Sequence, residues 1–328
     1  MYPSALPVPA PQSSHARLLS RLKNRHLVLL AHLGNLGSLT RTAVALGISQ
    51  PAATKTLAEL ETIFDAPLFL RTGARLVPTE LGRLAIVRSH HMLQALANWG
   101  QEMDTTRVGH RAHLNIGAVP YISGELLSQT LSILHREYGI ATTLVRATSD
   151  QLSLALARHE IDCLIGRYSH HARGETFTHQ HLFDQRPALI AHPTLARRLT
   201  RQAPDWQTLA TLNWILPSPF TPIGNVVTEI FAQAHATPPV PVVETYSLDV
   251  IAAMLRRDAT LISLLPETIV HDMVQRGDVG IVAWPLDWTL PPVNLIRRPR
   301  ETALWAEDML AEILLRLTQP LRAARTPS

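Results

Sequence analysis

Four side chains spaced along residues 50–55 could make directional contacts from one exposed helix face. The Gln50 amide can donate and accept a hydrogen bond at once, a pattern that matches the edge of an adenine. Thr54 can bond a base or a phosphate, Ala52 leaves room for a thymine methyl, and Lys55 can reach a phosphate. These residue types favour contact with a nucleic-acid groove. A structural helical hairpin with solvated polar residues fits the same pattern.

Those side chains need a helix to present them, and the neighbouring residues predict one over Ser49–Phe64. Ser49 suits the N-cap, and Pro51 suits the first turn, where a missing N–H costs nothing. The predicted buried stripe consists of Ala53, Leu57, Leu60 and Phe64. Shorter helical patterns over residues 22–36 and 39–46 precede this helix. Together they predict a helix-turn-helix, a unit that places its second helix in the major groove of DNA.

Positive charge is concentrated near the same helix. Residues 67–78 are typical of a small β-wing, on which Arg71 and Arg75 could anchor phosphates. Residues 1–88 hold 10 Lys and Arg against 4 acids, whereas residues 105–328 hold 20 of each. This asymmetry indicates a polyanion-binding module joined to a neutral module, or alternatively a solvated basic face.

Length and composition restrict the class of protein. A chain of 328 residues suggests about two domains. The single cysteine, Cys163, excludes an internal disulfide and is expected to be an inert core thiol. Neither His pair, 90–91 or 170–171, has the spacing of a zinc site, and no nucleophile or phosphate-binding motif occurs. With neither a membrane span nor a signal sequence predicted, a cytoplasmic location is the default expectation.

The chain before and after the wing differs in character. Residues 1–20 are rich in Pro, Ser and Ala and are predicted to be a disordered extension. Thr79 is predicted to cap a long helix over residues 79–104. One side of that helix is too apolar to stand free, so it is expected to pair with the same helix of a second copy.

From residue 112 the hydrophobic pattern changes to alternating strands and helices. Predicted strands cover residues 114–119, 142–146, 161–165, 188–192, 213–216, 240–246, 260–264, 279–283 and 293–297. This order predicts an α/β domain with mostly parallel sheets and two lobes that exchange strands. Ligands of such sheets bind outside the carboxyl ends of the strands.

Residues 22–82 contain a set of motifs in a fixed order: Ser38-Leu39-Thr40 leading to Ala43, the run Ser49-Gln50-Pro51-Ala52, Leu60-Glu61, Pro67-Leu68-Phe69 with Arg71, and Thr79 with Gly82. In these motifs the segment resembles the winged helix-turn-helix of LysR-type transcriptional regulators. The resemblance implies a DNA-binding domain over 21–82, a linker helix over 79–104 and a two-lobed effector-binding domain over 109–303 that resembles a periplasmic binding protein. The expected lobes are 109–182 with 283–303, and 183–282, followed by a C-terminal helix and tail over 304–328.

The resemblance also assigns contact residues. By position, the DNA contacts are Thr40, Ser49, Gln50, Pro51, Ala52, Thr54, Lys55 and Arg71, to which the wing adds Arg75. The implied effector contacts are Pro120, Tyr121, Ser123, Arg167, Tyr168, Ser218, Phe220, Thr221 and Ser247. Lys55 stands where many members have Arg, so it should contact phosphate rather than read guanine. Pro120 and Tyr121 stand where many members have Ser or Thr, and the Arg that many carry near residues 223–224 is absent. Arg167 is therefore the best charged candidate.

The expected function is that of a DNA-binding transcriptional regulator that senses a small metabolite. The expected partners are double-stranded promoter DNA with inverted repeats, a small-molecule effector and further copies of the chain, as a homodimer that builds a homotetramer. RNA polymerase is a further candidate partner, and no cofactor, metal or enzymatic activity is expected. Two alternatives stay open: a solute-binding protein without DNA function, and an enzyme built on the α/β domain.

Overall fold

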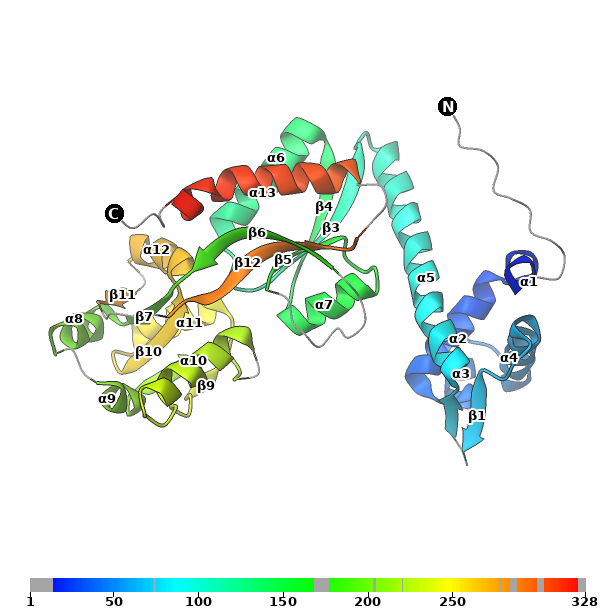
Figure 1. Cartoon of the computed structure of the whole chain (residues 1–328), viewed down its shortest axis with the longest axis horizontal. Coiled ribbons are helices and arrows are strands. Elements are labelled where there is room, and N and C mark those ends of the chain that lie inside the picture. Colours follow the sequence, from blue (N-terminus) through cyan, green and yellow to red (C-terminus); the bar gives the residue numbers. More distant parts are fainter. Residues whose placement is uncertain are drawn as a thin grey trace. The chain divides into compact units, whose positions relative to one another are not determined.

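A computed structural model describes residues 14–72, 75–167, 177–202, 205–219, 221–277, 279–283, 288–299 and 304–323 (Figure 1). The chain divides into two compact units, Met1–Gln101 and Glu102–Ser328. None of the described helices combines the length and the apolar composition that a bilayer span requires.

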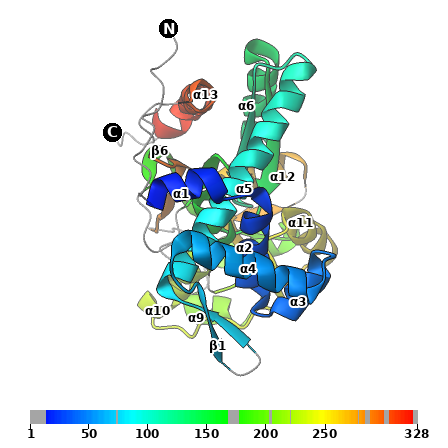
Figure 2. The ribbon, with the colours of Figure 1, turned by 90° about the vertical axis from the view of Figure 1, so that its right-hand side faces the viewer.

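The first unit is a winged helix-turn-helix (Figure 2). Its elements are α1 (Ser14–Arg21), α2 (Asn24–Leu36), α3 (Leu39–Ala45), α4 (Gln50–Phe64), the hairpin β1 (Phe69–Thr72) and β2 (Arg75–Pro78), and the start of α5 (Glu80–Arg107). Gly37 ends α2 with φ of 61°, a left-handed conformation that glycine adopts without strain. The Ser38 hydroxyl then caps α3 by accepting from the Arg41 N–H. These local signals explain why the predicted helices agree with α2, α3 and α4.

The prediction that residues 1–20 are disordered is wrong for Ser14–Ser20, which are helical. Helix α1 packs against α4. The Arg17 guanidinium lies 3.5 Å from the Asp65 carboxylate at the end of α4. Residues 1–13 lie outside the described residues.

The core of the first unit forms where α2, α3 and α4 meet. Leu29, Leu30 and Leu33 of α2 are each only 1% exposed. Helix α4 contributes Ala53, Leu57 and Leu60 as predicted, but the last buried member of its stripe is Ile63, while Phe64 is half-buried. Burial of this stripe fixes which face of α4 remains in solvent.

The start of α5 and the wing are held together by close backbone contacts. Thr79 donates its hydroxyl to the Pro67 carbonyl and accepts from the Gly82 N–H at 3.0 Å. A Cβ on Gly82 would lie 1.9 Å from the Leu68 carbonyl oxygen, so this approach requires glycine. The Glu61 carboxylate of α4 accepts from the Leu68 N–H at 2.8 Å. The wing is thereby attached to the helix that it flanks.

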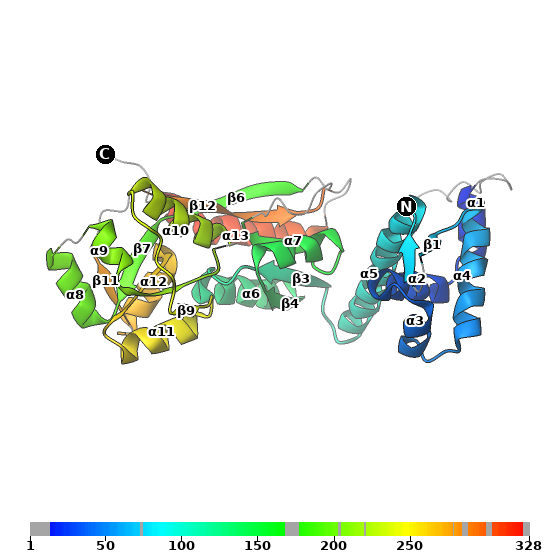
Figure 3. The same ribbon diagram turned by 90° about the horizontal axis from the view of Figure 1, so that it is seen from below.

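The second unit has two lobes, each built on a five-stranded sheet (Figure 3). The first lobe has strand order β4-β3-β5-β12-β6. Its elements are β3 (Ala112–Ala118), α6 (Gly124–Tyr138), β4 (Ile140–Arg146), α7 (Ser149–Ala157), β5 (Cys163–Gly166), β6 (Thr178–Gln185), β12 (Leu290–Arg297) and α13 (Trp305–Ala323). Figures 1 and 3 show β6 and β12 side by side and leading toward the second lobe.

The second lobe has strand order β11-β7-β10-β8-β9. Its elements are β7 (Pro187–Ala191), α8 (Pro193–Gln202), α9 (Trp206–Ala210), β8 (Asn213–Leu216), α10 (Pro222–Gln233), β9 (Val243–Glu244), α11 (Leu248–Arg257), β10 (Leu261–Pro266), α12 (Glu267–Gln275) and β11 (Gly280–Val282). The fully buried Trp214 lies in its core, with ring centroids 5.6 Å from Phe231, and donates its indole N–H to the Leu209 carbonyl.

Several predicted details of this unit are wrong. The sheets are mixed rather than mostly parallel, because β6, β7, β11 and β12 pair antiparallel with their neighbours. Strand β6 was not predicted, and the strand predicted over 240–246 shrinks to Val243–Glu244. Helix α13 packs its apolar face into the core of the first lobe instead of forming a separate segment after it. The first sheet also extends through Gln185, so the lobes change at residue 186.

Candidate functional site

The face of α4 opposite its buried stripe is polar and open to solvent. The Ser49 hydroxyl caps the helix by accepting from the Ala52 N–H at 3.3 Å. All nine predicted DNA contacts are exposed: Thr40, Ser49, Gln50, Pro51, Ala52, Thr54, Lys55, Arg71 and Arg75. They lie on α3, at the beginning of α4 and on the wing. The fold therefore presents these residues on the accessible face of one unit.

The hydrogen bonds within α4 limit what Thr54 can do. Its hydroxyl donates to the Gln50 carbonyl at 3.0 Å. With its proton engaged in this bond, the oxygen can still accept from a base amino group. The Gln50 side-chain amide forms no hydrogen bond with another described residue, so it can both donate and accept.

The two acidic side chains of α4 are engaged away from this face. Glu59 accepts from Arg25 at 2.7 Å and from His26 at 3.3 Å, while Glu61 binds the wing backbone. Lys55, Arg71 and Arg75 have no ion-pair partner among the described residues. Neutralised acids and unpaired cations on one unit give the positive field that a polyanion needs.

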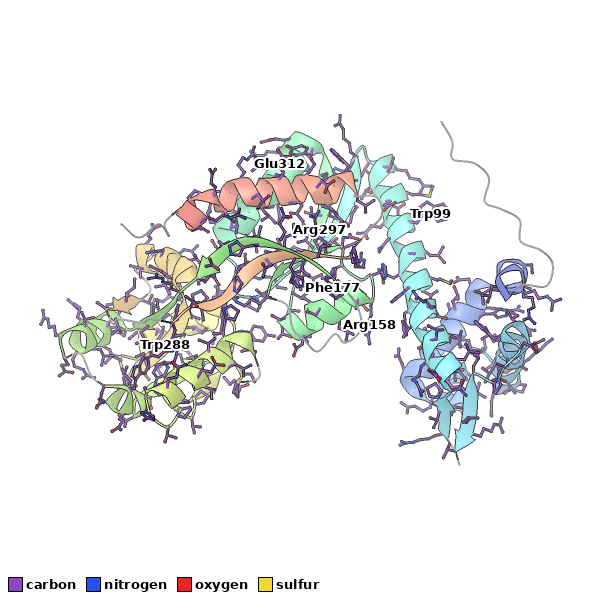
Figure 4. All side chains as sticks on the ribbon, in the orientation of Figure 1. Trp99, Arg158, Phe177, Trp288, Arg297 and Glu312 are labelled. Carbon is purple, nitrogen blue, oxygen red and sulfur yellow. The ribbon has the colours of Figure 1, made fainter. Side chains whose placement is uncertain are left out.

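Helix α5 exposes an apolar stripe. Its members are Leu84, Val87, Met92, Leu96, Trp99 and Met103, each between 46% and 62% exposed. They recur mostly at spacings of three and four residues, so they share one side of the helix. The Trp99 side chain, 62% exposed, projects from the ribbon of α5 (Figure 4). A large exposed apolar stripe marks a protein-interaction surface.

A cavity of about 240 Å³ lies between the two lobes of the second unit. Its walls are Val119, Pro120, Tyr121, Thr148, Ser149, Asp150, Arg167, Pro217, Ser218, Thr221, Ile223 and Tyr246. These residues follow the carboxyl ends of β3, β4, β5, β8 and β9 or begin helices α7 and α10. The cavity thus lies where open α/β sheets bind ligands.

Five of the nine predicted effector contacts line this cavity. They are Pro120, Tyr121, Arg167, Ser218 and Thr221. Ser123 is instead occupied as the cap of α6, where its hydroxyl accepts from the Glu125 N–H. Ser247 precedes α11 and is not part of the cavity wall. Tyr168 and Phe220 lie outside the described residues.

Sequence reasoning missed the wall formed by the start of α7. Thr148 caps this helix in a reciprocal arrangement with Gln151, and Ser149 and Asp150 occupy its first turn beside the cavity. The signal was available, because a Thr followed three residues later by Gln after a strand is the signature of a helix start. Tyr246, which follows β9, has no comparable local signature.

Arg167 is the charged group most deeply buried in the cavity wall. Only 4% of the Arg167 surface is exposed. Its Nε donates to the Pro291 carbonyl at 2.7 Å, and an Nη donates to the Gln185 amide oxygen. Burial lowers the pKa of Arg167 to about 10, still far above neutral pH, so the guanidinium remains charged.

Tyr121 links the two lobes. It follows β3 of the first lobe, but its ring packs in the core of the second lobe. The Arg146 guanidinium donates to the carbonyls of Pro120 and Ile122 and so holds the loop that carries Tyr121. The buried Tyr121 hydroxyl has no hydrogen-bond partner among the described residues. Burial also raises its pKa, which keeps the hydroxyl protonated and able to donate.

Residue 224 itself has no room for an arginine. A Cβ on Gly224 would lie 2.1 Å from the Ser218 carbonyl oxygen. The loop before α10 therefore folds too tightly to admit any side chain at that position. Arg167 remains the arginine that lines the cavity among the described residues.

Other chemistry has little support in the described part of the chain. Its His, Cys, Asp and Glu side chains form no group of three that could hold a metal ion. Cys163 is fully buried in β5, and burial raises the pKa of its thiol well above the usual range. A thiol in that state is a poor nucleophile.

Comparison with known proteins agrees with this architecture. Residues 24–83 match the model of the bacterial regulatory helix-turn-helix protein, lysR family, and residues 107–317 match the LysR substrate binding domain. The HTH-type transcriptional regulator GbpR of Azospirillum brasilense is 27% identical over 282 residues, which cover 85% of this chain and 81% of GbpR.

Solved structures show the same fold. The full-length regulator CbnR in complex with its target DNA has a TM-score of 0.58 at 16% identity and covers 90% of this chain and 99% of its own. LysG of Corynebacterium glutamicum, solved with bound effector Arg, has a TM-score of 0.56 at 20% identity and covers 92% and 100%. Since the two family models together span both units, the chain belongs to the LysR family of transcriptional regulators, with a helix-turn-helix DNA-binding domain and an effector-binding domain.

Proposed function

We propose that this regulator reads inverted-repeat promoter DNA with the exposed face of α4 and anchors the duplex with its wing. The observation that carries the proposal is the distribution of charge within the first unit. Glu59 and Glu61 are engaged by the fold, whereas Lys55, Arg71 and Arg75 are exposed and unpaired among the described residues. Gln50 and Ala52 read base edges, and the three cations contact phosphates.

The inverted repeat follows from pairing of two copies through the apolar stripe of α5. Two-fold symmetry of the protein requires two-fold symmetry of the site, with half-site centres separated by about one helical turn or a multiple of it. Two such dimers form the tetramer. Because the proposed target is promoter DNA, we expect the protein to act in the cytoplasm, with RNA polymerase as a candidate partner.

The effector binds in the cavity between the lobes of the second unit. Because both lobes supply wall residues, a ligand there bonds to both and shifts the population of lobe arrangements. The role is regulatory rather than enzymatic. The described wall of the cavity carries polar groups that can bind and orient a ligand, and no paired acid and base with a nucleophile occurs among its described residues.

Electrophoretic mobility on the DNA upstream of the gene tests the DNA-binding proposal. Gln50→Ala should weaken binding to the specific site by about 1–3 kcal/mol while leaving non-specific binding unchanged. Thr62→Ala is the matched control, because Thr62 is exposed at the other end of α4 and donates to the Ala58 carbonyl. Equal loss in both variants, or none in either, would remove α4 from the interface.

A further inference from the structure

Two arginines are buried among the described residues of the second unit, and they differ in how their charge is balanced. Arg298, 9% exposed, lies 3.5 Å from the Asp162 carboxylate and donates to the Leu156 and Ile161 carbonyls. Arg167, 4% exposed, donates to neutral oxygens and has no acidic partner within ion-pair distance among the described residues. A buried, uncompensated cation in a cavity wall calls for an anion.

The neutral partners of Arg167 belong to the two strands that lead from one lobe to the other. Gln185 is the last residue of β6, and Pro291 lies at the beginning of β12. Gln185 continues the chain of hydrogen bonds, because its amide donates to the Thr268 hydroxyl of the second lobe at 2.8 Å. A ligand that binds Arg167 and shifts its guanidinium therefore affects both strands that connect the lobes.

The choice of glutamine rather than glutamate at residue 185 keeps Arg167 uncompensated. The two side chains have nearly the same shape, but a carboxylate would satisfy the guanidinium internally. Gln185 is only 2% exposed, so solvent does not screen this difference. Gln185 is thus a positioning residue for Arg167 that does not itself line the cavity.

Tyr121 adds a second requirement on the ligand. The hydroxyl of this wall residue is buried and has no hydrogen-bond partner among the described residues, so it is an unsatisfied donor whose burial costs stability. Asp150 adds a negative charge to the same wall and disfavours a second acidic group on the ligand. The cavity of about 240 Å³ is smaller than the usual range for ligand sites, so the ligand is compact.

We propose that the effector is a compact organic monoacid whose carboxylate pairs with Arg167, and that a hydroxyl oxygen outside the carboxylate, where the acid has one, accepts a hydrogen bond from Tyr121. The proposal rests on the assignment of this cavity as the effector site. It adds the chemical class of the ligand, and it makes Gln185 the residue that couples the acid to the connections between the lobes.

The test compares acids with their neutral amides on the full-length protein. The probes are acetate, glycolate, benzoate and 4-hydroxybenzoate, and the matched amides of each, at pH 7.5 and constant ionic strength. Thermal unfolding ranks the probes, since a ligand that binds the folded state raises its stability, and calorimetry measures the affinity of those that act. We expect at least one acid to bind about tenfold or more tightly than its amide.

Three variants separate charge from structure. Gln185→Glu should abolish the preference for the acid, leave the amide unchanged and raise the melting temperature of the unliganded protein. Thr268→Val breaks the same chain of hydrogen bonds without adding charge and should keep the preference. Tyr121→Phe should remove only the advantage of a hydroxy acid over the plain acid, about threefold to tenfold.

The proposal is overturned if the parent binds the acids no more tightly than their amides. This includes the case in which neither the acids nor the amides bind. It is also overturned if Gln185→Glu retains the preference for the acid. Binding of the upstream DNA is measured on every variant. If the parent binds the upstream DNA but does not prefer the acids, the proposed class of effector is wrong and the proposed DNA-binding function stands. If the parent does not bind the upstream DNA, the proposed function itself is refuted.

Discussion

The phosphate contacts can be counted by replacing cations one at a time. Lys55, Arg71 and Arg75 are exposed on α4 and the wing and have no acidic partner among the described residues. Changing each to Gln removes one positive charge and keeps a polar side chain of similar length. If each cation contacts one phosphate, each substitution removes one contact and releases fewer counterions on binding.

The size of the effect follows from the salt dependence of DNA binding. Each phosphate contact contributes a slope of roughly 0.9 in the logarithm of affinity against the logarithm of salt concentration. Between about 50 and 200 mM salt, a fourfold range, one contact then accounts for about a 3.5-fold loss of affinity. Over that range, the fold-loss of affinity of the triple variant should be about 40 times smaller than that of the parent. The sign is fixed as well: the variant binds more weakly at low salt, and the two curves converge as salt rises.

Fluorescence anisotropy on the upstream duplex measures these slopes. The control is Arg25→Gln, which removes a cation of the same unit that is already paired with Glu59 at 2.7 Å. Its slope should equal that of the parent, and circular dichroism should show that all variants are folded. A triple variant with the parental slope, or an Arg25 variant with a reduced slope, would refute the reasoning that unpaired cations mark the interface.

Three further predictions concern the rest of the first unit. Trp99→Asp places a charge in the apolar stripe of α5 and should shift the protein toward monomers in sedimentation experiments, whereas an unchanged mass would exclude the stripe from the interface. His26 accepts a hydrogen bond from the Lys23 N–H through Nδ1, and burial lowers the pKa of its imidazole below the usual 6.5. The unfolded chain therefore takes up a proton at His26 more readily than the folded chain, so the free energy of unfolding should be highest above pH 6.5 and should fall as the pH drops below it. In urea titrations His26→Gln should flatten this fall; an equally steep fall would implicate other groups. Gly82→Ala should cost about 2 kcal/mol or more, whereas Gly100→Ala, with open space around its Cβ, should stabilise by up to about 1 kcal/mol in chemical unfolding.

The helices of the first unit could be predicted because their ends are encoded locally. Ser38 and Ser49 act as caps, and Gly37 adopts the left-handed conformation at the end of α2. Each of these signals acts over three or four residues and needs no distant partner. Helix α1 lacks a comparable signal, and its contact with α4 is tertiary.

Strand β6 could not be predicted for a different reason. Its sequence, Thr178–Gln185, is mostly polar, and the strand lies at the edge of its sheet with β12 as its neighbour. The propensity of an edge strand is decided by its cross-strand partner rather than by its own residues. That partner begins more than 100 residues later in the chain, at Leu290.

The cavity was predicted in part because the carboxyl ends of strands can be located from the pattern. Pro120, Tyr121 and Arg167 follow predicted strands and do line the cavity. Ser123 fits the same rule but is occupied by capping α6. A pattern locates a residue near a site, whereas its free hydrogen-bonding capacity depends on contacts that only the folded chain shows.

This distinction applies most strongly to charge. The sequence contains 28 arginines and lysines beyond Arg167 and Arg298. Both of these arginines follow predicted strands, and nothing local separates one from the other. In the folded chain, Asp162 lies beside Arg298, while Arg167 contacts only the neutral acceptors of Gln185 and Pro291 among the described residues. The first is a structural ion pair, and the second is a charge still available to a ligand. The same criterion separates Lys55 from Arg25 in the first unit, so in both units the charged residues predicted as contacts keep a charge that the described fold leaves unpaired.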